Sequence, residues 1–463
     1  MGIEIFFISI IHIRNTVKIT YLGSASILVE DNGTKVLCDP WLVDGEFYGS
    51  WAHYPPVNYA PNEFNDVDFI YVSHIHPDHF SVRTLSKMNK KIPILLHDFH
   101  YKYLKDNIVQ LGFTPIELQH NKRTHLKNDT YINILAADNC DPQLCFKYFG
   151  CGLAEKKFGS TSIDSMSVID NGKEVIVNTN DCPFSLGQTS ASIIKNAYRE
   201  IDMLLVGYSS ATAYPQCFDL TESERENAKK SIIQKFLSQS ESYVNLLKPR
   251  FFLPFAGRYV LSGKNWILNE KRAVPELEDA YEYFINSPNI DQSKQKCVIL
   301  NLKSSFNTKT GKASQPYDKI DKNEKRAYIE QVLANQKYDY ELESEPATEE
   351  ILELIPRCYE RFERKRKEQG FNSDTKVLLD VNNDRILSIS CDGNGYSFIS
   401  KEEASKISKF VSISLDKKLL RWLLLGPKLA HWNNAEIGSH LRYKRKPDIY
   451  ERGLFYCLNF FHV

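Results

Sequence analysis

The chain has 463 residues, and its 58 basic side chains balance 58 acidic ones, so the formal net charge is zero at neutral pH. Apolar residues make up 42% of the chain and charged residues 25%, which is typical of a globular protein of two or three domains. The neutral balance argues against bulk electrostatic attraction to nucleic acid. The ten cysteines form no C-x-x-C pair and no disulfide framework, which indicates a reducing, cytoplasmic location.

The chain divides into four segments by composition. Residues 1–16 contain an apolar run that is too short to span a bilayer and lacks the flanks of a signal peptide, so we expect an extension such as an added edge strand and no membrane span. Residues 17–302 alternate β-branched runs with helical patterns and are predicted to form a catalytic domain. Residues 303–326, rich in Ser, Asn, Lys and Thr, are predicted to be a linker or a long loop, and residues 327–463 a C-terminal α+β domain.

Local signals predict hairpins and a long helix in the catalytic segment. The tripeptide Asp-Asn-Gly occurs at residues 31–33 and again at 170–172, each time between two β-branched runs. Asn-Gly tolerates the positive φ angles of a type I′ turn, so both sites are predicted to be tight hairpins. Thr221 and Glu224 have the spacing of a capping box, and the helical apolar stripe that follows ends at Pro249.

The most informative segment is a strand that leads into clustered histidines. A predicted hydrophobic strand at residues 68–73 is followed directly by His-Ile-His-Pro-Asp-His, which begins at His74. Alternate residues of an extended chain point the same way, so His74 and His76 are predicted to bind one cation, while Asp78 and His79 reach a second. Imidazole suits zinc and iron, and a carboxylate beside it favours a binuclear site. Asp78 is also the candidate catalytic residue, because it is placed to accept a proton from metal-bound water.

A binuclear site needs further ligands, and strand ends are the places to look for them. Asp181 ends a predicted strand and is expected to bridge the two metals. Asp138 and Asp141 follow another predicted strand, and we expect one of them to be the third ligand of the first metal. His120 and His125 lie in a Lys- and Asn-rich loop and are weaker candidates, which we expect to be exposed.

Several other short segments accompany the histidine motif, and together they carry a resemblance. These segments are Gly23-Ser24-Ala25-Ser26, Asp39-Pro40-Trp41-Leu42, Pro55-Pro56, Asn178-Thr179-Asn180-Asp181-Cys182, Pro254-Phe255-Ala256-Gly257, Arg442, Arg445 and Pro447-Asp448-Ile449-Tyr450. The chain resembles the metallo-β-lactamase superfamily and, within it, is similar to the CMP-N-acetylneuraminate hydroxylase family and its bacterial relatives. The resemblance implies an αββα sandwich with a binuclear metal site at one sheet edge.

The sequence departs from the resembled families in two places. The hydroxylase family carries a Rieske iron–sulfur domain with the ligand motifs C-x-H and C-x-x-H, and neither motif occurs in this sequence. Many superfamily members supply a histidine to the second metal near the final strand, but residues 254–259 contain none. Arg258 and its neighbour Tyr259 are candidates for binding an anionic group of the substrate instead, because the guanidinium fork suits phosphate or carboxylate. A structural ion pair is the alternative for Arg258.

Three functions remain open at this level. The first is metal-dependent hydrolysis of a small anionic substrate by a metal-bound hydroxide, with two divalent ions, zinc before iron or manganese. The second is a di-iron oxygenase that acts on a nucleotide sugar or a similar small molecule and takes electrons from a partner protein. The third is a non-catalytic binding protein on the same fold. The C-terminal domain resembles sterol-carrier-like tails, and it is expected to line a hydrophobic pocket, to support a homodimer or to form ordinary core.

Overall fold

The computed structural model describes residues 17–99, 101–136, 164–382 and 385–463. The predicted extension at residues 1–16 lies outside the described residues, and so do the two candidate ligands Asp138 and Asp141. Within the described ranges no helix has the length and apolar character needed to cross a membrane.

The first of two large sheets is built mainly from the N-terminal part of the chain. In the described residues it has eight strands in the order β17-β16-β1-β2-β3-β5-β6-β7. Strands β3, β5, β6 and β7 run parallel, and β1, β2 and β3 form an antiparallel meander. The strands are β1 (Lys18–Gly23), β2 (Ser26–Asp31), β3 (Thr34–Cys38), β5 (Phe69–Tyr71), β6 (Ile94–His97), β7 (Pro115–Leu118), β16 (Ser305–Asn307) and β17 (Lys312–Ala313).

The second sheet packs face to face on the first. Its seven described strands follow the order β15-β13-β12-β11-β10-β9-β8. Buried apolar side chains from both sheets, such as Ile27 and Leu205, form the core between them. The strands are β8 (Thr124–Lys127), β9 (Thr130–Ala136), β10 (Ser165–Asp170), β11 (Val175–Asn178), β12 (Met203–Gly207), β13 (Phe251–Phe255) and β15 (Lys296–Cys297).

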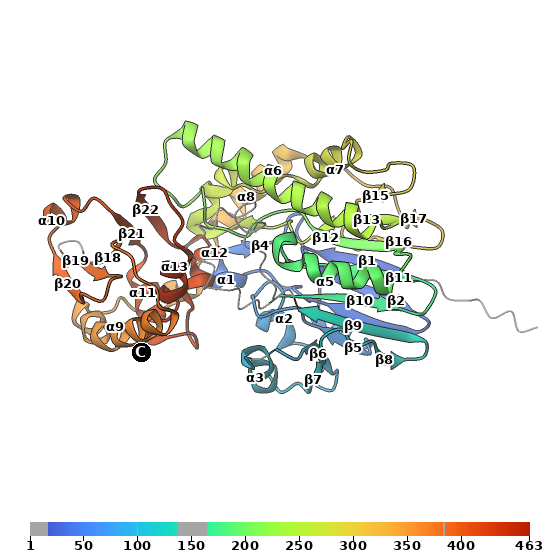
Figure 1. Ribbon diagram of the computed structural model, residues 1–463, viewed down its shortest axis with the longest axis horizontal. Coiled ribbons are helices and arrows are strands. Elements are labelled where there is room, and N and C mark those ends of the chain that lie inside the picture. The colour runs from blue at the N-terminus through green and yellow to red at the C-terminus, as the bar shows by residue number, and fades with distance from the viewer. Residues whose placement is uncertain (1–16, 100, 137–163, 383–384) are drawn as a thin grey trace, which may run out of the picture.

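Helices cover the outer face of each sheet, as Figure 1 shows for α5 and α6 on one side and α2 and α3 on the other. On the first sheet, Leu104 of α3 shares an apolar core with Ile94. On the second sheet, Val244 of α6 shares a core with Leu204. The four layers confirm the αββα sandwich that the resemblance implies. The helices are α2 (Val82–Leu85), α3 (Tyr103–Gln110), α5 (Phe184–Ala197), α6 (Glu222–Leu247) and α7 (Leu277–Ile285).

The two Asp-Asn-Gly segments form different turns. In the first, Asp31 pairs with Thr34, and Asn32 and Gly33 both have positive φ angles of 48° and 75°, so the type I′ hairpin is confirmed. In the second, Asp170 pairs with Val175. The predicted hairpin is thus confirmed, but its turn is not type I′. Side-chain oxygens of the segment accept backbone N–H bonds and hold a four-residue loop between the strands. The capping box of Thr221 at the start of α6 is confirmed.

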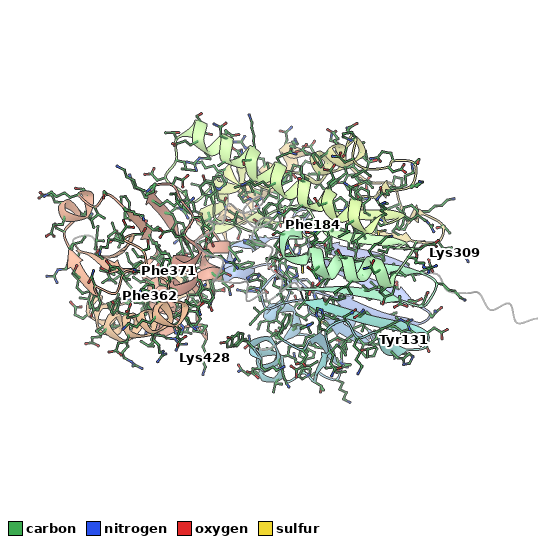
Figure 2. The ribbon with its side chains drawn as sticks, in the orientation of Figure 1. Tyr131, Phe184, Lys309, Phe362, Phe371 and Lys428 are labelled. Atoms are coloured by element: carbon green, nitrogen blue, oxygen red, sulfur yellow. The ribbon has the colours of Figure 1, made fainter. Side chains whose placement is uncertain are left out.

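The C-terminal part of the chain, coloured orange to red in Figure 1, adds a smaller sheet with helices packed against it. Its strand order is β20-β19-β18-β21-β22. Figure 2 marks Phe362 and Phe371 in its interior, and this core is continuous with Trp41, Phe47 and Trp51 of the sandwich. The elements are α9 (Thr348–Gln369), β18 (Lys376–Asn382), β19 (Arg385–Ser390), β20 (Tyr396–Ile399), α10 (Lys401–Ser405), β21 (Phe410–Ser414), α11 (Lys417–Leu425), α12 (Trp432–Ile437), β22 (Arg442–Lys446) and α13 (Arg452–Leu458).

The segment expected to be a linker is partly built into the sandwich. Within residues 303–326, β16 pairs with β1, and β17 pairs with β16 at the edge of the first sheet. Helix α8 (Lys322–Gln331) then begins before the segment ends, capped by Asp321, whose side chain accepts two backbone N–H bonds. The short elements α1 (Glu46–Gly49), β4 (Trp51–Ala52) and β14 (Val260–Leu261) complete the contact between the sandwich and the C-terminal part.

Candidate metal centre

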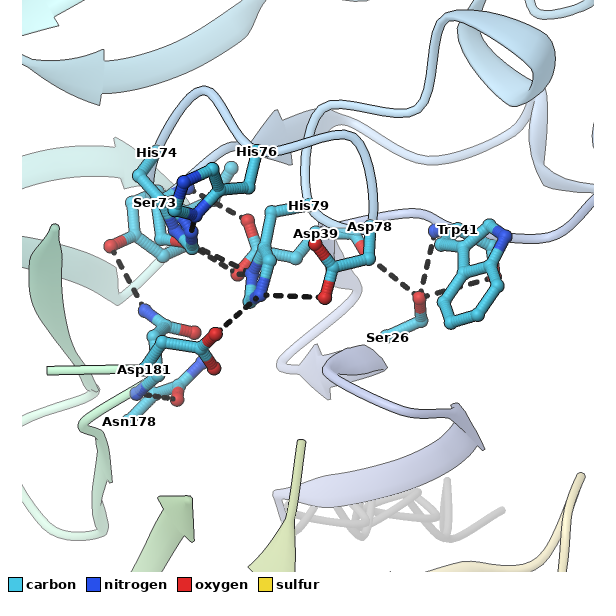
Figure 3. A network of polar contacts seen from close by, with 12 residues as sticks. Ser26, Asp39, Trp41, Ser73, His74, His76, Asp78, His79, Asn178 and Asp181 are labelled. Atoms are coloured by element: carbon cyan, nitrogen blue, oxygen red, sulfur yellow. Dashed lines mark hydrogen bonds and ion pairs between the residues drawn. The ribbon is translucent and has the colours of Figure 1, made fainter. Parts of the chain in front are cut away.

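The histidine motif lies in the loop between β5 and α2, at the end of the parallel strands of the first sheet. His74, Asp78 and His79 are buried, and His76 is partly exposed. Nε2 of His74 lies 2.9 Å from Nδ1 of His76, so both rings direct a nitrogen to one point (Figure 3). This is the convergence that alternate residues on an extended segment are expected to produce.

Asp181 follows β11 of the second sheet and faces the same loop. Its Oδ2 lies 3.3 Å from Nε2 of His79, and the same nitrogen lies 3.5 Å from Oδ2 of Asp78. The ligand atoms of His74, His79 and Asp181 all lie within 4.8 Å of one another. The structure therefore brings together the five residues of the predicted cluster, and it joins the edges of both sheets at this point.

A further carboxylate, Asp164, completes the cluster and was not among the predicted ligands. It immediately precedes β10, and its Oδ1 lies 3.6 Å from Nε2 of His74. The ligand atoms of Asp164, His74 and His76 also lie within 4.8 Å of one another. A carboxylate was expected as third ligand of the first metal, but Asp138 and Asp141, the residues proposed for it, lie outside the described residues.

The remaining candidates lie away from the cluster. His120 and His125 are exposed, as expected; Nδ1 of His120 accepts a hydrogen bond from the backbone N–H of Ala136, and Nε2 of His125 lies 2.6 Å from the carbonyl oxygen of Asn128. Tyr259, only 6% exposed, stacks on Trp51 with ring centroids 3.4 Å apart and belongs to the core.

Asp39, the residue after β3, holds His79 in place from the side opposite the ligands. Its Oδ2 lies 3.0 Å from Nδ1 of His79 and accepts a hydrogen bond from Oγ of Ser73, while its Oδ1 accepts the backbone N–H of Ser73 (Figure 3). A carboxylate on Nδ1 fixes the tautomer in which Nε2 carries the free lone pair. Because β3 and β5 are parallel neighbours, their carboxyl ends place Asp39 and Ser73 side by side.

The electrostatics of the cluster fit a bound cation. Burial raises the pKa of Asp78 to about 7 and that of Asp164 to about 6, while burial lowers the pKa of His74 well below its usual range. Nε2 of His79 is buried and has no hydrogen-bond partner among the described residues, although it faces two carboxylates. Against the lowering effect of burial, the charges of Asp181, Asp78 and Asp39 raise the pKa of His79 well above its usual range. Crowded carboxylates around a buried imidazole are the arrangement that a divalent cation stabilises in place of a proton.

The C-terminal part of the chain also reaches the cluster. Nε2 of His76 lies 3.1 Å from Oδ1 of Asn433, on α12. His431, two residues earlier, also lies near the His76 ring. Burial lowers the pKa of His431 to about 4, and the charge of His76 contributes to this shift. The amide oxygen of Asn433 can accept the Nε2–H bond of His76, which leaves Nδ1 free to bind metal.

We therefore predict that Asn433→Ala weakens metal binding about tenfold to hundredfold without unfolding the chain. The physical reason is the loss of the acceptor that selects the His76 tautomer. Titration of the metal-free protein with Fe²⁺ or Zn²⁺ measures the effect. Asn433→Asp keeps an acceptor at the same place and should restore most of the affinity. Equal metal affinity of the Ala variant and the unchanged protein would contradict the prediction.

Comparison with known proteins agrees with this geometry. Residues 18–155 match the profile of a family described as the beta-lactamase superfamily domain. The N-terminal part of the chain contains a β-lactamase superfamily domain. This domain contributes β1 to β9, together with the loop that carries the histidine motif. The second sheet from β10 onward, including Asp164 and Asp181, lies beyond the matched residues.

The chain is also similar to several proteins that are longer than it is. A zebrafish (Danio rerio) cytidine monophosphate-N-acetylneuraminic acid hydroxylase is 24% identical over 258 residues, covering 52% of this chain and 38% of that protein. The hydroxylase of Asterias rubens is 26% identical over 305 residues, covering 63% and 42%. A Mycobacterium tuberculosis protein provisionally named a Rieske 2Fe-2S iron-sulfur protein is 26% identical over 243 residues, covering 52% and 43%. The match thus spans about two fifths of each relative.

Solved structures that are similar to this chain are more distant in sequence. CmlA from Streptomyces venezuelae, described as a diiron β-hydroxylase, has a TM-score of 0.40 and 15% identity, covering 63% of this chain and 54% of that one. A metallo hydrolase from Ignicoccus hospitalis has a TM-score of 0.39 and 12% identity, covering 63% and 98%.

Proposed function

We propose that this chain is a dinuclear metal-dependent oxygenase that hydroxylates a small anionic molecule. The observation that carries the proposal is the position of Asp164 beside His74 and His76. Two histidines and one carboxylate around an open position are the ligand set of non-haem iron oxygenases. Catalytic zinc is held by three histidines or by the same set of two histidines and a carboxylate. The carboxylate fits iron at this half of the centre, and the remaining oxygen donors of the cluster add to the case for iron.

The donor set of the other half points in the same direction. It consists of His79 with the carboxylates of Asp78 and Asp181, so the whole cluster offers three imidazoles and three carboxylates. Oxygen donors suit iron and manganese better than they suit softer metals. Two iron ions held there would supply the redox chemistry by which one oxygen atom of O₂ enters a C–H bond and the other leaves as water, at the cost of two external electrons.

The residues of the chain have separable roles in this proposal. His74, His76 and Asp164 would hold one ion, Asp78 and His79 the other, and Asp181 would bridge them. Asp39 keeps the proton of His79 on Nδ1, so that Nε2 stays directed at the metal. Asp181 is partly exposed, with 28% of its side chain accessible, which leaves a path by which a small molecule can approach the centre.

The relatives support the choice of reaction and suggest a substrate class. Three of the proteins compared above are named as hydroxylases, two of them acting on a cytidine monophosphate sugar by name. By analogy, we propose that the substrate of this chain is a nucleotide sugar or a similar anionic molecule. Since neither C-x-H nor C-x-x-H occurs in the 463 residues, the two electrons would come from a separate donor protein.

Metal-dependent hydrolysis is the second candidate, and the lack of those same motifs favours it. Hydrolysis needs only water as co-substrate, so a chain without an iron–sulfur ligand motif could carry it out unaided. In that case two zinc ions would occupy the centre, and Asp78 would accept the proton of the attacking water. The substrate would again be small and anionic.

Metal analysis combined with oxygen uptake separates the two candidates. The protein is purified without added metal, its metals are counted by mass spectrometry, and oxygen uptake is followed after chemical reduction. We expect about two irons per chain, a visible absorption band that reduction bleaches, and oxygen uptake that chelation abolishes. Two zinc ions per chain, with no spectral change on reduction, would overturn the oxygenase and leave hydrolysis.

A further inference from the structure

A second candidate site lies in a cavity that shares no lining residue with the metal centre. The cavity has a volume of about 550 Å³ and lies between the segment after β13, residues 257–276, and helix α8. Volumes of this size are typical of small-molecule sites. Gly257 lets this segment lie close to the residues after β12, because a Cβ there would lie 2.6 Å from the ring of Tyr208. Arg258 is thereby held in the cavity wall.

Two arginines of this wall lack an acidic partner. Among the described residues neither Arg258 nor Arg272 forms an ion pair, and Nη1 of Arg258 is buried without a hydrogen-bond partner. Arg272 is only 7% exposed, and its guanidinium carbon lies 4.5 Å from the centre of the Tyr259 ring. Its Nη2 donates to the carbonyl oxygen of Tyr259, whereas its Nε and Nη1 have no hydrogen-bond partner among the described residues. A buried guanidinium with free donors is costly unless an anion binds it.

The acidic side chains that line the cavity form ion pairs with basic residues other than these two arginines. Glu276 pairs with Lys325 at 2.5 Å, and Glu330 and Glu270 pair with Arg326 at 2.8 and 3.6 Å. Burial lowers the pKa of Lys325 against the opposing effect of Glu276, and the positive charges of Arg272 and Arg258 lower it further. The two arginines therefore lie close to this pair. The charge of Glu278, which does not line the cavity, acts on Arg258, whereas none of the lining carboxylates forms an ion pair with either arginine.

From this arrangement we propose that the cavity binds a phosphate-bearing small molecule. Three guanidinium nitrogens of Arg258 and Arg272 have no hydrogen-bond partner among the described residues, and their N–H donors match the several oxygens of a tetrahedral anion better than the two coplanar oxygens of a carboxylate. A phosphate monoester carries nearly two negative charges at pH 7, which balances the two unpaired arginines. The rest of the molecule would lie against Tyr54 and Trp266, which line the same cavity.

Binding of inorganic phosphate to the full chain tests the proposal directly. Calorimetric titration with phosphate, and with acetate for comparison, is carried out on the unchanged protein, on Arg258→Gln and on Arg258→Lys. We expect phosphate to bind more tightly than acetate, Arg258→Gln to weaken phosphate at least tenfold, and Arg258→Lys to weaken it less. Unmeasurable phosphate binding at 10 mM, or equal affinity for acetate, would overturn the proposal.

Two further variants exclude a general charge effect and binding at the metals. Lys87→Gln removes one positive charge from an exposed site outside the cavity and should leave phosphate affinity unchanged. Asp181→Ala, which disables the metal centre, should retain phosphate binding. Loss of binding in either variant would mean that the anion does not depend on this cavity. Phosphate binding in this cavity is independent of the proposed reaction. The protein could contain iron and take up oxygen even if the cavity bound no phosphate.

Discussion

Replacing Asp181 by alanine is expected to reduce bound metal from two ions per chain to one or fewer. We also expect activity to fall by more than about a hundredfold, because losing a residue that merely orients a metal ligand already costs up to about a hundredfold. The reason is position: Asp181 is the carboxylate that joins the second sheet to His79, and its ligand atom also lies within 4.8 Å of that of His74. Metal content and, once a substrate is found, steady-state kinetics measure the effect.

A carboxylate at the opposite end of the same sheet provides the control for this prediction. Asp202 accepts the backbone N–H of Val175 at the start of β11, and Asp202→Asn keeps that acceptor. This variant should bind two metals and retain full activity. Two metals in Asp181→Ala would show that the acid is not a ligand and would refute the bridging role.

Asp164→His is expected to shift the metal preference of the centre from iron to zinc by about tenfold or more and to abolish oxygen uptake. The change replaces the carboxylate beside His74 and His76 with a third imidazole, which is the ligand set of a catalytic zinc site. Cells grown with equal iron and zinc would supply the protein, and mass spectrometry of the purified chain would give the ratio.

The comparison for this variant is Asp164→Glu, which keeps a carboxylate at the end of a longer side chain. It should retain iron, with weaker binding if the extra methylene displaces the ligand atom. An unchanged ratio of iron to zinc in Asp164→His would mean that residue 164 does not select the metal. In that outcome the main argument for oxygenation would be lost, and hydrolysis would become the better proposal.

The sequence alone was informative wherever the signal was local. A strand followed by the motif that begins at His74 predicted four clustered ligands, because neighbours along an extended segment cannot be far apart in space. The type I′ turn at residues 31–33 and the capping box of Thr221 were likewise predicted correctly, since a few consecutive residues determine each. At residues 170–172 the hairpin was predicted correctly but its turn type was not, because side-chain bonds across the loop hold a longer turn.

Asp164 shows how near the sequence came to the complete ligand set. Ser167 of β10 pairs with Asn178 of β11 in antiparallel register, so Asp164 and Asp181 each lie three residues beyond that pair, at one edge of the sheet. The hairpin itself was recognisable from the sequence. The residue before its first strand is therefore as good a candidate for a ligand as the residue after its second.

Only the tertiary structure decided how the rest of the centre is assembled. The contact of His79 with Asp39 joins residues 40 positions apart through two parallel strands, and that of His76 with Asn433 joins residues 357 positions apart through a shared core. Local patterns cannot indicate such pairs, because the packing of whole sheets and helices determines which side chains meet. The sequence by itself thus determined the ligand motif and its strand, while tertiary packing determined the partners that orient and complete it.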